Sequence, residues 1–224
     1  MKLLALDAAT EACSVALLQG EELCERYELI GRGHAERLLP LVDELLVEAG
    51  LRLAGLDAIA FGRGPGGFTG LRIAAGITQG LAAGAGLPVL PVSNLAALAA
   101  AGASESGARR VLACLDARMG EVYWAAFDCG DAQPLALTPE AVTKPEAVQL
   151  PDGEPCFGVG PGLAAWPLLV ERLGPGLRGC NPALLPRAAW IARLGALDLA
   201  AGRAVDAAFA LPRYLRDNVI ISQQ

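Results

Sequence analysis

Hydrophobic and polar residues follow strand-like and then helix-like spacing over the first hundred positions. Short apolar runs separated by turn residues predict three strands at residues 2–6, 12–18 and 23–29. The remaining pattern predicts these elements in order: helix 34–49, strand 56–61, helix 70–85, strand 88–92 and helix 94–101. Strands that alternate with helices in this way are typical of an α/β domain with a partly parallel sheet.

The second half of the chain repeats this pattern in a shorter form. It predicts these elements: strands 111–115, 121–127 and 156–159, and helices 160–173 and 186–201. Each half opens with a hairpin that has an aspartate at its turn, Asp7 or Asp116. The small and polar stretch 103–107 is the best candidate for a hinge. We therefore predict two related α/β lobes at residues 1–102 and 103–224, the second of them shortened.

Two helices of the first lobe have unusual surfaces. The helix predicted at residues 34–49 has apolar positions on more than one stripe, and the next long helix has glycines at four-residue spacing. Each glycine inside a helix costs about 0.5–1 kcal/mol relative to alanine. The glycines are explained either by close packing on the chain's own sheet or by close approach of another molecule. The candidate partner-binding residues are Leu38, Val42, Leu45, Ile73, Gly76, Ile77, Gly80 and Gly84.

The composition is apolar, with 54% hydrophobic residues and a mean hydropathy of +0.42. The most apolar run, residues 71–87, is interrupted by Arg72, Thr78, Gln79 and four glycines, so we predict no membrane span. The apolar excess instead indicates a sheet buried on both faces and a surface for another subunit. Because Asp7 precedes any signal-like segment, we expect a cytoplasmic chain whose six cysteines are reduced.

Charge and histidine content limit the possible functions. The chain has 18 basic and 24 acidic residues, whereas a protein that binds nucleic acid alone usually has a basic face. We therefore expect any RNA contact to be shared with a partner. His34 is the only histidine, and hydrolytic zinc sites usually need two or three. We assign no catalytic and no metal-binding residue, and expect a structural or interface role for His34 rather than that of a general base.

The glycine-rich stretch 62–67 matches the GxGxxG pattern between a strand and a helix. A dinucleotide site also needs an acidic residue about 20 positions later, but the chain has none between Asp57 and Glu105. The lysine of a P-loop is missing as well. Two interpretations remain: a tight turn that lets the helix start close to the sheet, or an anion-receptive helix N-terminus near Arg63 and Arg72.

Asp7 and Asp116 have two interpretations of their own. Carboxylates at two hairpin turns can position a magnesium–phosphate group between lobes. Aspartate also favours turns for purely local reasons, because its side chain accepts hydrogen bonds from the backbone nearby. The sequence pattern leaves both interpretations open.

Several segments together resemble one family. They are residues 7–10 (DAAT), 34–40 (HAERLLP), 62–72 (GRGPGGFTGLR), 116–123 (DARMGEVY) and 212–216 (PRYLR). The chain resembles the TsaB family, also called YeaZ, over nearly its whole length. The resemblance implies a duplicated actin- and Hsp70-like (ASKHA) fold with two ribonuclease-H-like lobes. It also implies a non-catalytic subunit of the system that forms threonylcarbamoyladenosine in tRNA.

The resemblance implies partners as well. The catalytic paralogue TsaD would modify the adenosine next to the anticodon, the ATPase TsaE would be a third partner, and tRNA would be reached indirectly through the complex. The pairing surface would be the two first-lobe helices, which form a homodimer when the chain is alone. The metal-binding HxxxH pair of the catalytic branch falls on Asn94 and Leu98, so the resemblance implies that this metal site is absent.

Some alternatives remain. No cofactor is expected, although a vestigial ATP–magnesium site is conceivable at Asp7, Thr10 and Asp116. An independent ATPase or sugar kinase of the same fold would use such a site. A peptidase is the second alternative, because the family has carried a glycoprotease label.

Overall fold

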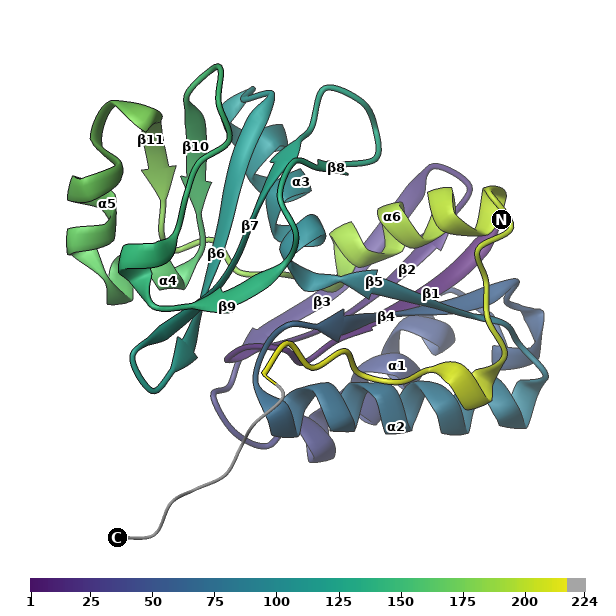
Figure 1. Ribbon diagram of the computed structural model, residues 1–224. Coiled ribbons are helices and arrows are strands. Elements are labelled where there is room, and N and C mark those ends of the chain that lie inside the picture. Colours follow the sequence, from purple (N-terminus) through teal and green to yellow (C-terminus); the bar gives the residue numbers. More distant parts are fainter. Residues whose placement is uncertain (217–224) are drawn as a thin grey trace, which may run out of the picture.

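The first five strands form one sheet with the order β3-β2-β1-β4-β5 in the computed structural model, which describes residues 1–216. These strands are β1 (Lys2–Asp7), β2 (Ala12–Gln19), β3 (Glu22–Leu29), β4 (Ala58–Gly64) and β5 (Val89–Ser93). The first three are joined by antiparallel pairing, whereas β1, β4 and β5 run parallel. The carboxyl ends of the parallel strands therefore meet at one edge of the sheet, beside the second lobe (Figure 1).

Helices cover both faces of this sheet: α1 (His34–Glu48) and α2 (Phe68–Ala85) on one face, and α6 (Ala188–Ala200) on the other. Side chains of β1 alternate between the two cores. Leu4 and Leu6 pack in the cluster that includes α1 and α2, while Leu3 and Ala5 pack in the cluster that includes α6. This alternation explains why β1 is apolar almost throughout, as expected for a strand buried on both sides.

The second lobe has a sheet with the order β11-β10-β6-β7-β8, and β9 pairs with β7. Its strands are β6 (Arg110–Arg118), β7 (Glu121–Asp128), β8 (Leu135–Ala136), β9 (Ala141–Thr143), β10 (Cys156–Val159) and β11 (Leu177–Asn181). The helices around it are α3 (Asn94–Ser106) on the side of the first lobe, and α4 (Pro161–Ala165) and α5 (Pro167–Leu173) on the other side. Short 3-10 turns lie at Leu53–Gly55, Pro145–Ala147, Gly174–Gly176 and Ala207–Phe209.

The predicted division into lobes is wrong for the C-terminal part of the chain. Residues 103–107 are no hinge, because α3 continues to Ser106 and packs against strands of both sheets. The helix α6 packs on the first sheet, where Ile191 and Leu194 join its core. The apolar pattern of α6 indicates that the helix is buried, but it cannot indicate against which sheet. The last residues of the predicted range, 217–224, lie outside the described part.

Other differences are local. The predicted helix 160–173 is two short helices, α4 and α5, which meet at Trp166 where Pro167 interrupts the chain. The strand β11 was not predicted, because it contains Gly179 and its side chains are only half-buried or exposed. All six cysteines are free thiols. Among residues 1–216, no helix is both long and apolar enough to cross a membrane.

Candidate functional site

The glycine-rich stretch 62–70, which runs from the end of β4 into the first turn of α2, packs against the turn between β1 and β2. A Cβ atom at Gly62 would overlap the carboxylate of Asp7, and one at Gly70 would overlap the carbonyl oxygen of Ala8. Glycine is needed at both positions because any side chain would push the loop away from the sheet. The tight-turn interpretation of this motif is therefore confirmed.

The anion-site interpretation is not supported, because its two arginines have other partners. The Arg63 guanidinium donates to the Glu140 carboxylate at 3.3 Å. The Arg72 guanidinium lies 3.7 Å from the ring centroid of Phe68 and donates through Nε to the Tyr214 hydroxyl at 2.9 Å. The two arginines thus point to different neighbours instead of converging on one anion.

Asp7 is sealed inside the protein at the end of β1, with 0% exposure. The Asn94 side-chain amide donates to Asp7 Oδ1 at 2.6 Å, and the amide oxygen of Asn94 accepts from the Gly64 N–H at 2.7 Å. Burial raises the pKa of Asp7 to about 7, although the hydrogen bond from Asn94 and the backbone N–H groups of Ala9 and Ala8 act in the opposite direction. Oδ2 of Asp7 has no partner within the described chain.

The remaining residues of the candidate nucleotide site are used locally. The Thr10 hydroxyl accepts from the Ala12 N–H at 3.3 Å. Asp116 accepts from the Arg118 N–H at 2.9 Å and pairs with the Arg118 guanidinium at 3.1 Å. In residues 1–216, no hydrogen bond joins Asp7 to Asp116, and no group of three His, Cys, Asp or Glu side chains is placed to hold a metal. Magnesium needs accessible carboxylate oxygens, so the three residues do not fit a magnesium nucleotide in this arrangement.

Three further positions from the sequence are also internal. Asn94 and Leu98, where the metal pair of the catalytic branch falls, both have 0% exposure, and Leu98 packs in an apolar cluster. The ring of His34 is buried at the start of α1, and its Nε2 donates to the carbonyl oxygen of Thr10 at 3.0 Å. This bond ties α1 to the turn between β1 and β2, which is a structural contact.

The prediction of partner-binding residues is wrong for α1. Leu38, Val42 and Leu45 have at most 4% exposure and belong to the core between the sheet and the two helices. The apolar residues that α1 exposes are Leu39 and Val47, the latter 71% exposed. The sequence showed that the apolar stripe was broad, but it did not indicate which side of the stripe faces the sheet.

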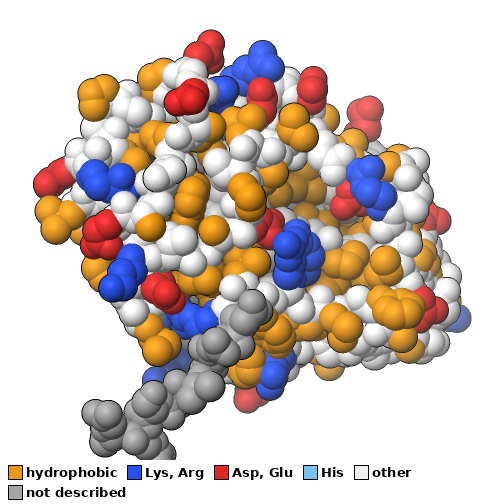
Figure 2. Space-filling view, viewed as in Figure 1, with side chains coloured by type: hydrophobic (Ala, Val, Ile, Leu, Met, Phe, Trp, Pro, Cys, Tyr) orange, Lys and Arg blue, Asp and Glu red, His pale blue; other side chains and the backbone are white. Residues whose placement is uncertain are grey.

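The glycines of α2 point outward. Gly76, Gly80 and Gly84 are exposed, and a Cβ atom at any of them would meet no atom of residues 1–216 within 4 Å. Packing on the chain's own sheet therefore does not explain them. Figure 2 shows hydrophobic side chains along the lower edge of the molecule, where α2 lies in Figure 1. We define the docking face as the outer side of the two helices: Leu39, Val47, Ile73, Gly76, Ile77, Gly80 and Gly84.

Residues 203–216 form a strap along α2, which the periodicity of the sequence did not predict (Figure 1). The N–H of Arg213 donates to the carbonyl oxygen of Arg63 at 2.7 Å, and its guanidinium lies 3.6 Å from Glu140. Arg216 pairs with Glu121 at the start of β7. The strap thus joins the glycine-rich loop to the second lobe. Its only signal in the sequence is the motif at residues 212–216.

Comparison with known proteins identifies the family. The family model for TsaD, tRNA N6-adenosine threonylcarbamoyltransferase, matches residues 27–163. The tRNA threonylcarbamoyladenosine biosynthesis protein TsaB of Escherichia coli K12 is 44% identical over 226 residues, covering 98% of this chain and 96% of that protein. The chain belongs to the TsaB family.

Other relatives agree with this assignment. TsaB of Haemophilus influenzae is 43% identical and covers 98% of this chain and 95% of that protein. The solved structure of YeaZ from Pseudomonas aeruginosa has a TM-score of 0.90 and 48% identity, covering 96% of this chain and 99% of that one. The predicted family and the predicted two-lobed ASKHA fold are both confirmed.

Proposed function

We propose that the chain is the partner subunit of a complex that forms threonylcarbamoyladenosine in tRNA, and that its docking face binds TsaD, the catalytic paralogue. Membership of the TsaB family supports the reaction, because its relatives are named for that biosynthesis. The observation that supports the surface is the outward stripe of Gly76, Gly80 and Gly84. These glycines weaken α2 and gain no contact with the described part of the chain, whereas a partner helix can approach their backbone closely.

Under this proposal TsaD performs the transfer and the chain supports it. The carboxylate of Asp7 is buried under Asn94, and position 98 is an apolar core residue. These features favour neither an independent ATPase or sugar kinase nor a peptidase. We also propose that the chain binds no magnesium nucleotide through Asp7, Thr10 and Asp116. In this scheme TsaE is the third member of the complex, and a second copy of the chain occupies the docking face when TsaD is missing.

The test is a matched set of substitutions on exposed helical positions. Gly80→Leu fills the notch on the docking face, so copurification with TsaD is expected to be lost while the chain stays folded. Gly80→Ala adds a single methyl group and is expected to weaken the complex less. Ala200→Leu adds the same apolar side chain at the exposed end of α6, on the opposite face of the sheet, and is expected to leave the complex intact.

Two results would contradict the proposal. One is a complex that survives Gly80→Leu together with the same change at Gly76 and Gly84, which would place the docking surface elsewhere. The other is threonylcarbamoyl transfer to tRNA by the purified chain alone, which would make the chain an enzyme in its own right.

A further inference from the structure

We propose that the chain itself contacts a single-stranded stretch of the tRNA, through a corner at the N-terminal end of α2. The corner consists of Phe68, Arg72, Arg118, Arg213, Tyr214 and Arg216. This inference rests on the proposed function, since tRNA is then the substrate that the complex holds. It goes beyond it by assigning an RNA contact to this subunit rather than to its partner alone.

The first argument is a preformed pair of exposed aromatic rings. Phe68 is 51% exposed, and its ring centroid lies 5.3 Å from that of Tyr214, which is also exposed. The Arg72 guanidinium lies over the Phe68 ring and donates to the Tyr214 hydroxyl, so both rings are held in place. Unpaired bases of RNA stack on aromatic rings and on arginine planes of this kind.

The second argument is charge. The chain as a whole is acidic, yet arginines outnumber their carboxylate partners here. Arg213 shares Glu140 with Arg63, and Arg72 pairs with no carboxylate within residues 1–216. Arg118 pairs with Asp116, but its side chain is 87% exposed. Exposed ion pairs are worth little, so phosphate groups can compete for these guanidinium groups.

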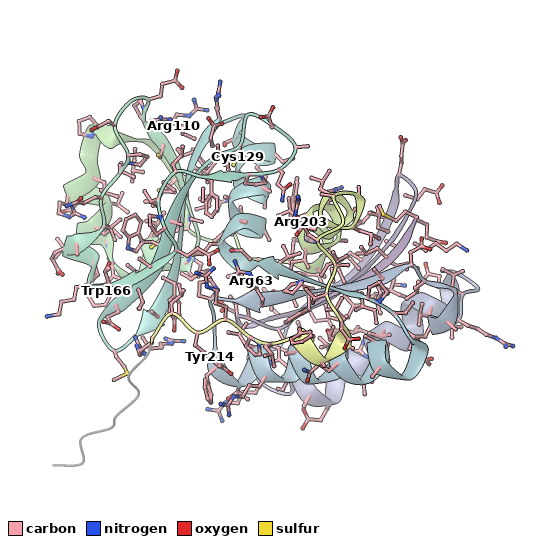
Figure 3. The ribbon with its side chains drawn as sticks, turned by 45° about the vertical axis from the view of Figure 1, so that its right-hand side comes forward. Arg63, Arg110, Cys129, Trp166, Arg203 and Tyr214 are labelled. Carbon is pink, nitrogen blue, oxygen red and sulfur yellow. The ribbon has the colours of Figure 1, made fainter. Side chains whose placement is uncertain are left out.

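The third argument is position. The corner combines the start of α2, the strap and the turn between β6 and β7, so it lies where the two lobes meet. Figure 3 shows Tyr214 beside α2 below that junction, with Arg63 between the lobes. The docking face begins on the same helix at Ile73, so a protein seated there borders the corner. RNA that such a protein holds close to this border would then lie next to the corner.

The exposed groups of the corner favour RNA over a protein segment. They are cations and flat rings set side by side, which match the alternation of phosphates and unpaired bases along a single strand. The outward glycines further along α2 form a different kind of surface, which is narrow and carries no charge. The two surfaces on one helix therefore fit two different partners.

The stacking contribution is tested by binding of a fluorescent tRNA transcript to the complex of the chain with TsaD. Phe68→Ala is expected to weaken binding about tenfold, because one base loses its stacking partner. The slope of log affinity against log salt concentration is expected to stay unchanged. Phe209→Ala is the matched control, since Phe209 is 66% exposed on the same strap near the other end of α2. It is expected to leave tRNA affinity unchanged.

The phosphate contribution is tested by removing two exposed arginines together. Arg118→Ala with Arg213→Ala is expected to lower the magnitude of the salt slope by about 1.4, the value for two contacts to a single strand. The control removes Arg109 and Arg203, which are also exposed and paired with carboxylates, at Asp128 and Asp198. Figure 3 shows Arg203 on the upper side of the molecule, away from Tyr214. This control is expected to keep the full slope.

Copurification with TsaD is measured for every variant and separates the outcomes. Normal assembly with weakened tRNA binding supports the inference. Normal assembly with unchanged tRNA binding overturns it and leaves the proposed function standing. Loss of assembly in Phe68→Ala or in the arginine pair also overturns it, because the corner then belongs to the protein interface. Failure of the unaltered chain to bind TsaD overturns both proposals.

Discussion

The inner and outer sides of α2 use the same residue type for opposite purposes. On the inner side, Gly70 lies so close to Ala8 that no side chain fits between them. On the outer side, Gly76, Gly80 and Gly84 face open space. An inward glycine serves the fold of this chain, whereas an outward glycine in mid-helix weakens the helix, and the proposed docking of a partner would account for that cost. The spacing of glycines in the sequence does not distinguish an inward glycine from an outward one, but the surroundings of each glycine in the structure do.

The helix on the other face of the same sheet extends the comparison. In α6, a Cβ atom at Gly195 would lie 2.8 Å from the Cβ atom of Ala60. The glycine of α6 therefore serves internal packing, like Gly70 and unlike the three outward glycines of α2. Both α2 and α6 contain glycine inside the helix, but of these two helices only α2 has glycines that face open space within the described residues.

The sharpest test of this comparison places leucine on each side. Gly195→Leu is expected to cost about 4–5 kcal/mol, the upper end for a single substitution, because the side chain has no room between α6 and β4. Gly80→Leu is expected to change the free energy of unfolding by less than about 1 kcal/mol. Urea denaturation of the isolated variants measures both values. Equal losses of unfolding free energy in the two variants would show that the inward and outward glycines do not differ in their surroundings.

Asp7 gives a second test of the inner side, through pH. Its pKa is about 7 in the folded chain and 3.8 in the unfolded chain, so the folded state retains a proton that the unfolded state releases between these values. Stability from this group is present below about pH 4 and is lost as the pH rises to about 7. Asp7→Asn removes the titration.

The stability of Asp7→Asn relative to the unaltered chain is therefore expected to rise between about pH 4 and pH 7. The gain is on the order of 4 kcal/mol, and it levels off above pH 7. Urea denaturation at a series of pH values measures it. A difference that is constant with pH would mean that Asp7 is not buried as a protonated group.

Alanine on the outer side gives a smaller effect of the opposite sign. Gly76→Ala, Gly80→Ala and Gly84→Ala are each expected to raise the free energy of unfolding by about 0.5–1 kcal/mol, because alanine favours the helix and meets no neighbour. The affinity for TsaD is expected to fall at the same time. Thermal denaturation and titration calorimetry measure the two quantities. A gain in both would mean that the notch has no role in docking.

The smallest change in stability is expected on α1. Leu39→Ala removes an exposed side chain and is expected to alter the free energy of unfolding by at most about 0.5 kcal/mol while weakening TsaD binding. Its neighbour Leu38 is fully buried, so Leu38→Ala is expected to cost about 2–5 kcal/mol. Urea denaturation of the two variants measures both losses. A larger loss for Leu39→Ala than for Leu38→Ala would show that the buried and exposed sides of α1 are wrongly assigned.

Much of the fold could be predicted from the sequence. The strands β1 and β2 follow from their continuous apolar runs, and the helix that begins at His34 follows from its local periodicity. The strand at Cys156–Val159 has the predicted bounds. The packing of α6 could not be predicted in this way. A pattern shows that Ile191 is buried, but the choice between two sheets depends on contacts far apart in the chain.

The candidate site was predicted less completely, for the same reason. The outward stripe on α2 was found because glycine has a local cost that demands an explanation. Leu38 and Leu39 are the same residue type at adjacent positions. Only the way α1 packs on the sheet decides that Leu38 lies in the core and Leu39 on the surface. The corner around Tyr214 depends on the strap, which has no periodic pattern that would reveal where it lies.

The return of α6 to the first sheet also determines when that lobe can mature during synthesis. The strands β1, β2, β4 and β5 leave the ribosome well before α6, so the face that carries Leu3, Ala5 and Leu90 stays bare for most of translation. Domains generally fold from the N-terminus as they emerge, but this lobe lacks one of its layers until residues 188–200 have been added. A polypeptide released before α6 therefore exposes an apolar sheet, which favours proteolysis or aggregation, and the first lobe closes only when α6 has been made.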